Sequence, residues 1–279
     1  MSSIITLTTD FGYDDAYVAA LKGAILSTNP EANIIDISHS TEPQNILQAA
    51  FILGIAYRYF PKQTIHMAVV DPGVGSERRG IILKTPSALF VAPDNGILSY
   101  IIDDLFTVEG HSLTEHSHGL KEIVFKTGLE AVAITDPRFW RHPVSATFHG
   151  RDIFAPVAAG LSLGISLYEF GEKIKSLHVL SLPKPSCDSD GNLIGLVLHI
   201  DHFGTLITNI KSNELPGKDV LIEAAGQRIH GIDDYYAQNE GLMAIKGSSG
   251  YLEVSLRDGN AADFLGAAVG DEIKVTATV

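Results

Sequence analysis

The segment 69–80 is the end of an apolar strand that continues into a loop carrying the carboxylates of Asp71 and Glu77 and two guanidinium groups. Pro72 stops the strand, and the two glycines that follow let the backbone approach a ligand closely because they lack a Cβ atom. Asp71 and Arg78 place opposite charges in this one short loop. Such a loop is typical of a ligand site, and the alternative is a surface turn whose charged groups pair with each other.

A second segment, 146–156, supplies the histidine that the first loop lacks. If the two loops meet, Arg78 keeps the carboxylate of Asp71 ionised, and that carboxylate can orient His149. Together the three side chains can bind a water molecule and accept its proton as it attacks a substrate. The alternative for His149 is a packed or surface residue, since the chain contains 11 histidines.

Three carboxylates, those of Asp10, Asp14 and Asp15, follow the first predicted strand. They can bind Mg²⁺, or one of them can accept hydrogen bonds from a ribose diol. Asp14 and Asp15 also suit the N-terminus of the next helix, where a carboxylate caps the first turn. Asp10 lies before that cap and is therefore the strongest candidate for a ligand contact.

The C-terminal part of the chain has two further candidate motifs. Asp201 and Phe203 interrupt an apolar strand, and Ser248 and Ser249 lie between glycines. Donors between glycines can bind a carboxylate in a small backbone concavity, and an aspartate can meet an ammonium group. The pair would suit an amino-acid head group, and as isolated motifs both also fit hairpin turns.

Several chemistries are not favoured by the sequence. It has no phosphate loop and no Cys and His set with zinc spacing, so we expect no bound metal and no cofactor. The single cysteine, Cys187, excludes an internal disulfide and lies in a Pro, Ser and Asp-rich stretch, where it is an incidental thiol. Hydrolysis through a protein nucleophile is not indicated.

The overall composition of the chain argues against some classes of binding partner. A net charge of −13 argues against a nucleic-acid binder, because phosphate contacts need clustered Lys and Arg. No apolar run reaches the roughly 18 residues that cross a membrane. The N-terminus has no basic region followed by an apolar one. We therefore expect a cytoplasmic protein with a small-molecule substrate and with neither nucleic acid nor membrane as a partner.

From residue 4 to about 180, short β-branched runs alternate with helix-like segments. The alternation predicts an α/β domain whose mostly parallel sheet is flanked by helices. Asp10, Asp71 and Asp94 each follow an apolar strand and should lie at one edge of that sheet. The region 110–141 is irregular and is expected only to be a long excursion between strands. Predicted strands are 4–8, 33–37, 64–70, 80–84 and 89–92, and predicted helices are 14–28, 45–59 and 96–103.

Residues 183–192 are rich in Pro, Ser and Asp and are expected to be a linker after an N-terminal domain of residues 1–182. Beyond it the helical signal vanishes and short strands alternate with glycine-containing turns. The segment 193–279 is therefore expected to be a small β-barrel or sandwich domain. Its predicted strands are 193–200, 206–210, 220–224, 227–229, 242–245, 251–256 and 272–277.

Six motifs, in the right order along nearly the whole chain, resemble those of the S-adenosyl-L-methionine hydroxide adenosyltransferases, the hydrolytic (SAM hydrolase) relatives of the fluorinase and chlorinase. They are Thr-Thr-Asp-Phe-Gly at 8–12, residues 69–79, Ala-Pro-Asp-Asn-Gly at 92–96, residues 148–156, Asp-x-Phe-Gly at 201–204 and Gly-Ser-Ser-Gly-Tyr-Leu at 247–252. The resemblance implies a metal-independent enzyme in which water attacks the 5′ carbon of the adenosyl group, giving adenosine and L-methionine. Of the two folds left open for residues 193–279 it favours the barrel, and it also implies a homotrimer with each site between the N-domain of one subunit and the C-domain of its neighbour.

The resemblance also assigns roles to residues of this sequence. The catalytic trio falls on Asp71, Arg78 and His149. Substrate-binding positions fall on Asp10 for the ribose, with Asp15 and Tyr17 nearby, on Asp201 and Ser248 for the methionine end, and on Phe203, Glu253 and Leu256 for the adenine. Thr205 departs from the family, which usually has asparagine there, and threonine lacks the paired donor and acceptor of an amide.

Two other functions remain open. The halogenases carry an aromatic or apolar residue at the position of Asp71, and an anionic carboxylate there repels chloride. A chloride-using adenosyl transferase is therefore the less favoured enzyme. A sensor that binds S-adenosylmethionine or adenosine without turning it over belongs to another functional class. The products formed from S-adenosylmethionine distinguish the three.

Overall fold

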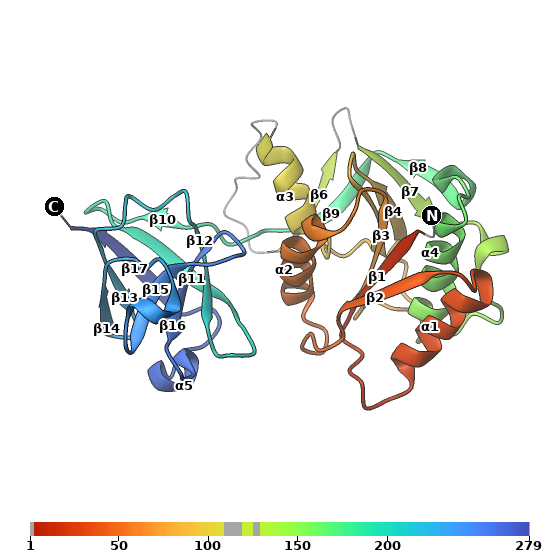
Figure 1. The fold of residues 1–279 in the computed structure, drawn as a ribbon. Helices are drawn as coiled ribbons and strands as arrows, with labels where there is room; N and C mark the ends of the chain where they lie inside the picture. The colour runs from red at the N-terminus through yellow and green to blue at the C-terminus, as the bar shows by residue number, and fades with distance from the viewer. Residues whose placement is uncertain (1–2, 109–118, 125–128, 279) are drawn as a thin grey trace. The chain divides into compact units, whose positions relative to one another are not determined.

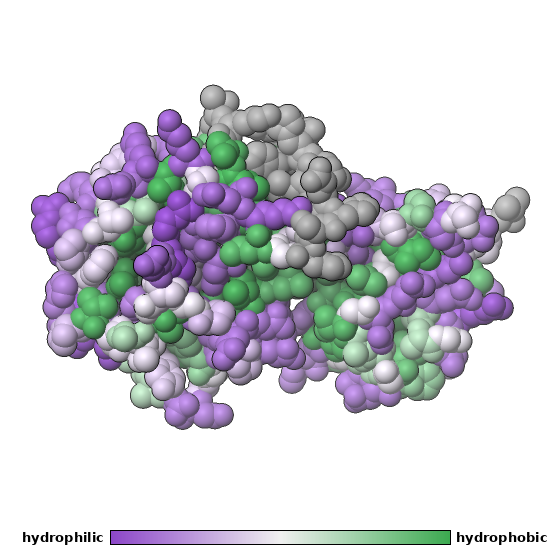
Figure 2. All heavy atoms as spheres, turned by 180° about the vertical axis from the view of Figure 1, so that it is seen from behind, coloured by the Kyte–Doolittle hydropathy of each residue, from purple (hydrophilic) through white to green (hydrophobic). Residues whose placement is uncertain are grey.

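The computed structural model describes residues 3–108, 119–124 and 129–278 (Figure 1). The chain forms two compact units, Met1–Leu182 and Pro183–Val279. Among the described residues, no helix has the length and apolar content needed to span a bilayer. Hydrophilic and hydrophobic side chains are intermixed on the face shown in Figure 2.

The first unit is built on a seven-stranded sheet with the order β2-β1-β3-β5-β4-β7-β8. Its strands are β1 (Ile4–Thr9), β2 (Asn33–Ser38), β3 (Thr64–Val69), β4 (Gly80–Lys84), β5 (Ala88–Pro93), β7 (Glu130–Ile134) and β8 (Gly171–Ile174). The pairs β1–β2, β1–β3 and β3–β5 are parallel, and the pairs from β5 outward to β8 are antiparallel. The α/β class is thus confirmed with a mixed sheet, in which β4 and β8 run against the other strands.

Helices cover both faces of this sheet (Figure 1). They are α1 (Tyr17–Thr28), α2 (Ile46–Ala56), α3 (Ser99–Val108) and α4 (Ala155–Ser162), with short 3-10 turns at Tyr57–Tyr59, Pro137–Phe139 and Leu167–Glu169. Because side chains alternate along a strand, Ile65 and Met67 of β3 pack with α1 and α4, whereas Ala68 packs on the other face with α2 and α3. A two-stranded sheet, β6 (Leu120–Val124) with β9 (Ser176–Leu180), adds apolar residues to that second core.

Helix starts were the least accurate predictions in this unit. Helix α1 begins at Tyr17 after Ala16, which provides no side-chain cap, so the interpretation of Asp14 and Asp15 as caps is wrong. Helix α3 begins at Ser99 because Gly96 has φ of +92°, a left-handed conformation that an α-helix cannot contain. Strands β6 and β7 lie in the irregular region 110–141, of which residues 110–118 and 125–128 lie outside the described residues.

The second unit is an antiparallel, barrel-like sheet with the order β14-β13-β17-β11-β12-β16-β15. Its strands are β10 (Ser186–Cys187), β11 (Leu193–Ile200), β12 (Leu206–Lys211), β13 (Val220–Ala224), β14 (Gln227–His230), β15 (Leu242–Lys246), β16 (Tyr251–Leu256) and β17 (Glu272–Ala277). The predicted linker 183–192 contains β10, which pairs with β11.

This unit also has secondary structure that the sequence did not indicate. Helix α5 (Ala261–Leu265) interrupts the run of strands, and the 3-10 turn Tyr236–Gln238 lies before β15. The side chain of Asn260 caps α5 by accepting the Asp263 N–H, and Gly266 ends the helix with φ of +63°. A five-residue helix is too short to show apolar periodicity, which is why the sequence pattern missed it.

Candidate active site

A cavity of about 700 Å³ lies in the first unit, at the carboxyl ends of β1 and β3. Asp10 enters it directly after β1, Asp71 enters it from the loop after β3, and His149 comes from the segment before α4. Its lining consists of Asp10, Phe11, Tyr17, Gln44, Val69, Asp71, Pro72, Val74, Ser145, Thr147, Phe148, His149, Gly150 and Arg151. This position at the ends of parallel strands is where α/β sheets commonly bind ligands.

Arg78 joins the two loops that carry Asp71 and His149. Its Nε donates to both carboxylate oxygens of Asp71 at 2.9 Å, and its Nη2 reaches Oδ2 at 2.5 Å. The same Nη2 lies 2.9 Å from Nδ1 of His149. Arg78 and Asp71 are largely buried, with side chains only 12% and 5% exposed, and the guanidinium lies over the ring of Phe154. The structure therefore brings the three predicted side chains together, with the arginine between the acid and the imidazole.

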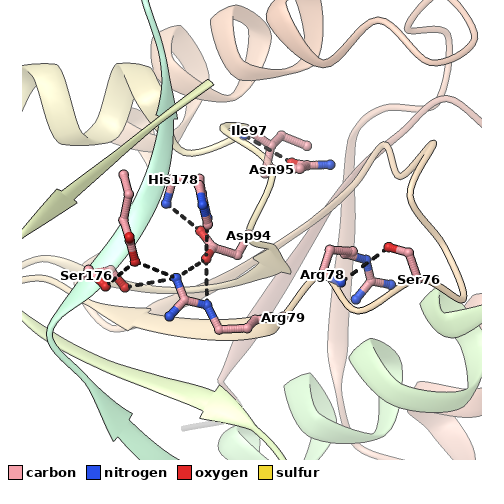
Figure 3. Close-up of polar contacts among 9 residues, drawn as sticks. Ser76, Arg78, Arg79, Asp94, Asn95, Ile97, Ser176 and His178 are labelled. Atoms are coloured by element: carbon pink, nitrogen blue, oxygen red, sulfur yellow. Dashed lines mark hydrogen bonds and ion pairs between the residues drawn. The ribbon is translucent and has the colours of Figure 1, made fainter. Parts of the chain in front are cut away.

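A glycine makes this meeting of loops possible. Gly75 has φ of +80°, and a Cβ atom placed on it would lie 2.6 Å from the backbone oxygen of Ala146. Any other residue would push the loop after β3 away from the segment that carries His149. The loop is also closed on itself, because the Ser76 hydroxyl donates to the Gly73 oxygen and accepts the N–H of Arg78 (Figure 3).

The surroundings of His149 favour its neutral form. Burial, followed by the cation of Arg78, lowers the pKa of the imidazole, and the carboxylates of Asp71 and Asp152 act in the opposite direction. A guanidinium only donates hydrogen bonds, so Nδ1 of His149 is the acceptor in its contact with Arg78. The neutral ring consequently carries its proton on Nε2.

The backbone after His149 forms a π-helical turn, Gly150–Phe154, which leads into α4. π-Helical turns are rare in proteins, and those that occur are often found at functional sites. The fully buried carboxylate of Asp152 anchors this one, because it accepts from the Arg151 guanidinium at 2.7 Å and from the Ser145 N–H at 2.9 Å. The buried Asp152 carboxylate thus links the residues before His149 to the π-helical turn that follows it.

Asp10 lies at another part of the cavity wall. One of its oxygens accepts the backbone N–H of Gln44 at 2.8 Å, and Gln44 adopts φ of +67°. Phe11 and Tyr17 each meet the ring of Phe148 edge to face, with centroids 5.5 and 5.4 Å apart, and their own rings lie tilted to each other at 6.1 Å. The cavity thus has a polar wall and an aromatic wall, which suits a ligand with both kinds of surface.

Some candidate residues lie away from the cavity. Asp15 is exposed and does not line it. Asp94 follows β5 at the predicted sheet edge, but its carboxylate pairs with Arg79 and His178. Within the parts of the chain that the structure describes, no group of three or more His, Cys, Asp or Glu side chains could hold a metal ion.

A Gly-x-Ser-x-Gly run at 160–164 also proves unrelated to the cavity. Ser162 is the last residue of α4, where its hydroxyl donates to the Ala159 oxygen and accepts from Asn29. A nucleophilic serine of this motif would instead lie on a strand-to-helix turn.

In the second unit, Asp201 and Thr205 form a closed turn between β11 and β12. Oδ1 of Asp201 accepts the N–H groups of Phe203 and Thr205, both at 2.9 Å. Phe203 at the tip is 75% exposed, whereas Thr205 is buried with its hydroxyl near that of Ser255. Ser248 lies in the turn between β15 and β16.

Glu253 and Leu256 lie on β16. Burial raises the pKa of Glu253, against a hydrogen bond from Tyr236 that lowers it. Glu253 is thus a buried carboxyl group with a defined partner, whereas Leu256, at the end of the strand, is only half-buried.

The sequence predicted Tyr17 near the site, but it did not indicate Gln44, Arg151, Phe11 or Phe148 as parts of the cavity. Gln44 follows Pro43 in a polar stretch, and its left-handed backbone has no signature in a single sequence. Phe11 and Phe148 lie in the motifs at 8–12 and 148–156, but their contacts with Tyr17 depend on α1 folding back over the sheet.

The family model of the SAM hydroxide adenosyltransferase N-terminal domain matches residues 5–171, and the model of the corresponding C-terminal domain matches residues 195–274. The chain belongs to the SAM hydroxide adenosyltransferase family. This confirms the relationship that the six motifs indicated.

Individual relatives agree with this family membership. The (R)-S-adenosyl-L-methionine hydrolase of Salinispora arenicola is 35% identical over 98% of this chain and 97% of its own length. A crystal structure of a conserved protein from Thermotoga maritima superposes with a TM-score of 0.82 at 33% identity, covering 98% of this chain and 99% of that one. The fluorinase of an Actinoplanes species is 27% identical over 76% of this chain and 73% of its own. The chain is therefore more similar in sequence to this hydrolase than to this fluorinase.

Proposed function

We propose that this protein hydrolyses S-adenosyl-L-methionine to adenosine and L-methionine. The observation that carries the proposal is the contact of Arg78 with both Asp71 and His149 at the wall of a cavity that also contains Asp10. The full-length relative from Salinispora arenicola is named for this substrate and for hydrolysis. A protein site that holds one water molecule in line with the carbon–sulfur bond can supply much of the acceleration by orientation alone.

The reaction balances without a cofactor. The oxygen of water forms a bond to the ribose 5′ carbon as the carbon–sulfur bond breaks, and the bonding pair leaves with sulfur. The sulfonium thereby becomes the neutral thioether of methionine, so the leaving group needs no general acid. The attacking water must lose one proton, and an acceptor for that proton is what the protein has to provide. We accordingly propose that activity requires neither metal nor cofactor.

The hydrogen-bond pattern of the trio suggests how its members divide the work. His149 accepts from Arg78 through Nδ1, so its Nε2–H is a donor that can hold the oxygen of the water. Asp71 offers carboxylate lone pairs on the cavity wall, and we assign it the proton from the attacking water. Arg78 keeps both groups in place and stabilises the negative charge of Asp71.

The substrate-binding assignments are part of the same proposal. Asp10 accepts hydrogen bonds from the ribose diol, with Tyr17 beside it and Asp15 farther out. In the second unit, Asp201, Thr205 and Ser248 contact the methionine end, and Phe203, Glu253 and Leu256 contact the adenine. The exposure of Phe203 supports this role, because a large exposed aromatic side chain is available to stack on a base.

The domain organisation, assembly and location are proposed on the same basis. We propose an N-terminal domain of residues 1–182, a linker of residues 183–192 and a barrel domain of residues 193–279. The family resemblance supports a homotrimer in which each site combines the first domain of one subunit with the second domain of its neighbour. We also propose that the protein is cytoplasmic and acts on free substrate, without a nucleic acid or a membrane as partner.

Product analysis tests the function directly. Purified protein is incubated with S-adenosyl-L-methionine in chloride buffer, and the products are separated by chromatography. Adenosine with L-methionine supports the hydrolase, 5′-chloroadenosine supports a halogenase, and unchanged ligand bound to the protein supports a sensor. The relative's name specifies an (R) form of S-adenosyl-L-methionine. The configurations of the amino-acid carbon and of the ribose are already fixed by "L-methionine" and "adenosyl", so (R) describes the sulfonium sulfur. The two diastereomers at sulfur should therefore be assayed separately.

A further inference from the structure

The turn after β5 contacts the residues just before and just after the loop that carries Asp71 and Arg78. Figure 3 shows its contact with Arg79. In the sheet order, β5 lies between β3, which leads to Asp71, and β4, which begins after Arg78. The residues that follow β5 are Asp94 and Asn95, and neither lines the cavity. Their side chains nevertheless bond to the residues immediately adjacent to Asp71 and Arg78.

Asp94 holds the residue after Arg78. Its carboxylate is 1% exposed and accepts from Nε and Nη2 of Arg79 at 2.9 and 2.5 Å. It also accepts from the backbone N–H of His178 at 2.7 Å and lies 3.0 Å from Nδ1 of the same residue. The backbone N–H of Asp94 donates to the Arg79 oxygen at 2.9 Å, so backbone and side chain fix Arg79 together.

Asn95 holds the residue before Asp71. Its Nδ2 donates to the backbone oxygen of Val70 at 2.8 Å, and its Oδ1 accepts the N–H of Ile97 at 3.3 Å. The two bonds use opposite ends of the amide and therefore define its orientation. The start of the loop that carries Asp71 is thus tied to the turn after β5.

We propose that Asp94 and Asn95 are positioning residues that hold the Asp71–Arg78 ion pair in register with His149. Asp94 acts through Arg79, and Asn95 acts through the carbonyl of Val70. Their catalytic effect rests on the proposed hydrolase function. Their effect on the geometry of the trio does not depend on it.

The charged groups around Arg79 indicate how Arg79 would move if the Asp94 carboxylate were removed. Without the Asp94 carboxylate, the ion-pair partner left to Arg79 among the described residues is Glu122, whose Oε1 lies 3.6 Å from Nη2 and whose side chain is 54% exposed. Arg79 would turn toward that exposed group and carry the backbone of Arg78 with it. A displacement of about 1 Å at a reacting group can cost roughly 100-fold in rate, so a small movement is enough.

The test compares Asn95→Ala and Asp94→Asn with a matched control, Asp104→Asn. Asp104 pairs with Arg58 in the same unit, and neither residue adjoins the trio. Each variant is assayed for kcat and KM, and the pKa of His149 is measured by NMR, with its signal assigned from its loss in His149→Gln. We expect kcat to fall about 10- to 100-fold in the two turn variants with little change in KM, and the control to retain wild-type values.

The NMR titration separates positioning from a general loss of stability. Arg78 lowers the pKa of His149, so its displacement should raise that pKa. Direct loss of the Asp94 charge would act in the opposite direction, and Asn95→Ala changes no charge at all. A raised His149 pKa in the turn variants, with none in Asp104→Asn, supports the proposal.

An unchanged His149 pKa in the folded turn variants would overturn the positioning proposal, whatever the activity of these variants. If Asp94→Asn does not fold, Asn95→Ala decides alone. The titration uses no substrate, so it remains decisive even if the wild-type protein proves not to hydrolyse S-adenosyl-L-methionine.

Discussion

The buried imidazole of His66 should make the first unit lose stability in mild acid. His66 lies in the middle of β3, only 1% exposed, with Nδ1 2.7 Å from the hydroxyl of its cross-strand neighbour Thr6. Its ring stacks on Phe90, with the edges of Tyr57 and Phe60 close by. Nε2 is a buried atom with no hydrogen-bond partner among the described residues. A proton added to this ring would therefore be a buried charge without a counter-ion.

The size of the effect follows from the pKa. Burial lowers the pKa of His66 from 6.5 to about 4. The unfolded chain therefore binds a proton below about pH 6.5 that the folded chain takes up only near pH 4. Stability falls as pH decreases through this window. At ~1.4 kcal/mol for each unit of pKa, the complete loss is about 3 kcal/mol.

Urea unfolding at pH 7 and pH 4.5 measures this loss. Trp140, the single tryptophan, lies in the same unit and reports its unfolding by fluorescence. The control is the double variant Thr6→Val/His66→Phe, which keeps the shapes while removing both polar partners. Between the two pH values the wild type should lose about 2.5 kcal/mol more than the double variant, because the effects of other titrating groups cancel in the difference. Equal losses in the two proteins would refute the reasoning.

The remaining predictions concern the proposed chemistry and assembly. Asp71→Asn and His149→Ala should each lower kcat by far more than they raise KM, because both residues act on the water; losses confined to KM would contradict these roles. Asp10→Ala should mainly raise KM, as a diol contact exists in both ground and transition states, and calorimetry showing normal binding would remove that assignment. Activity should persist in a chelator and yield no chlorinated product by mass spectrometry, whereas rescue by Mg²⁺ would point to the acidic residues near Asp10 as a metal site. Co-expression of an Asp71→Asn chain with a Ser248→Tyr chain, each inactive alone, should regain activity if sites form between subunits; verified mixed oligomers without activity would place each site within one chain.

Much of the strand pattern could be predicted from the sequence. The bounds predicted for β11, β13, β16 and β17 match the structure residue for residue. These strands are short and bounded by turn residues, with near-continuous apolar runs in β11 and β13 and alternating polarity in β16 and β17, so their signal comes from near neighbours in the chain. Helix starts were less accurate, as at α3, because the left-handed backbone of Gly96 is a property of the folded turn.

The residues of the candidate site were also recognisable, because strand ends in α/β sheets concentrate ligand groups. Asp10, Asp71 and His149 were identified before any geometry was known, and all line one cavity. What the tertiary structure decided is how they are arranged. Arg78 stands between Asp71 and His149, and the imidazole accepts from it, which the composition of two loops cannot specify.

The same distinction applies to the supports of the site. That Gly75 must be glycine follows from a backbone oxygen of Ala146, some 70 residues away, and not from its own loop. Asp94 was expected at the ligand edge, yet it pairs with Arg79 and His178 and does not line the cavity. Local sequence determines which segments become strands and which polar groups end them, because both depend on short-range periodicity and turn chemistry. The partner that each polar group finds is decided only when distant strands pair, since pairing alone sets which side chains share a face.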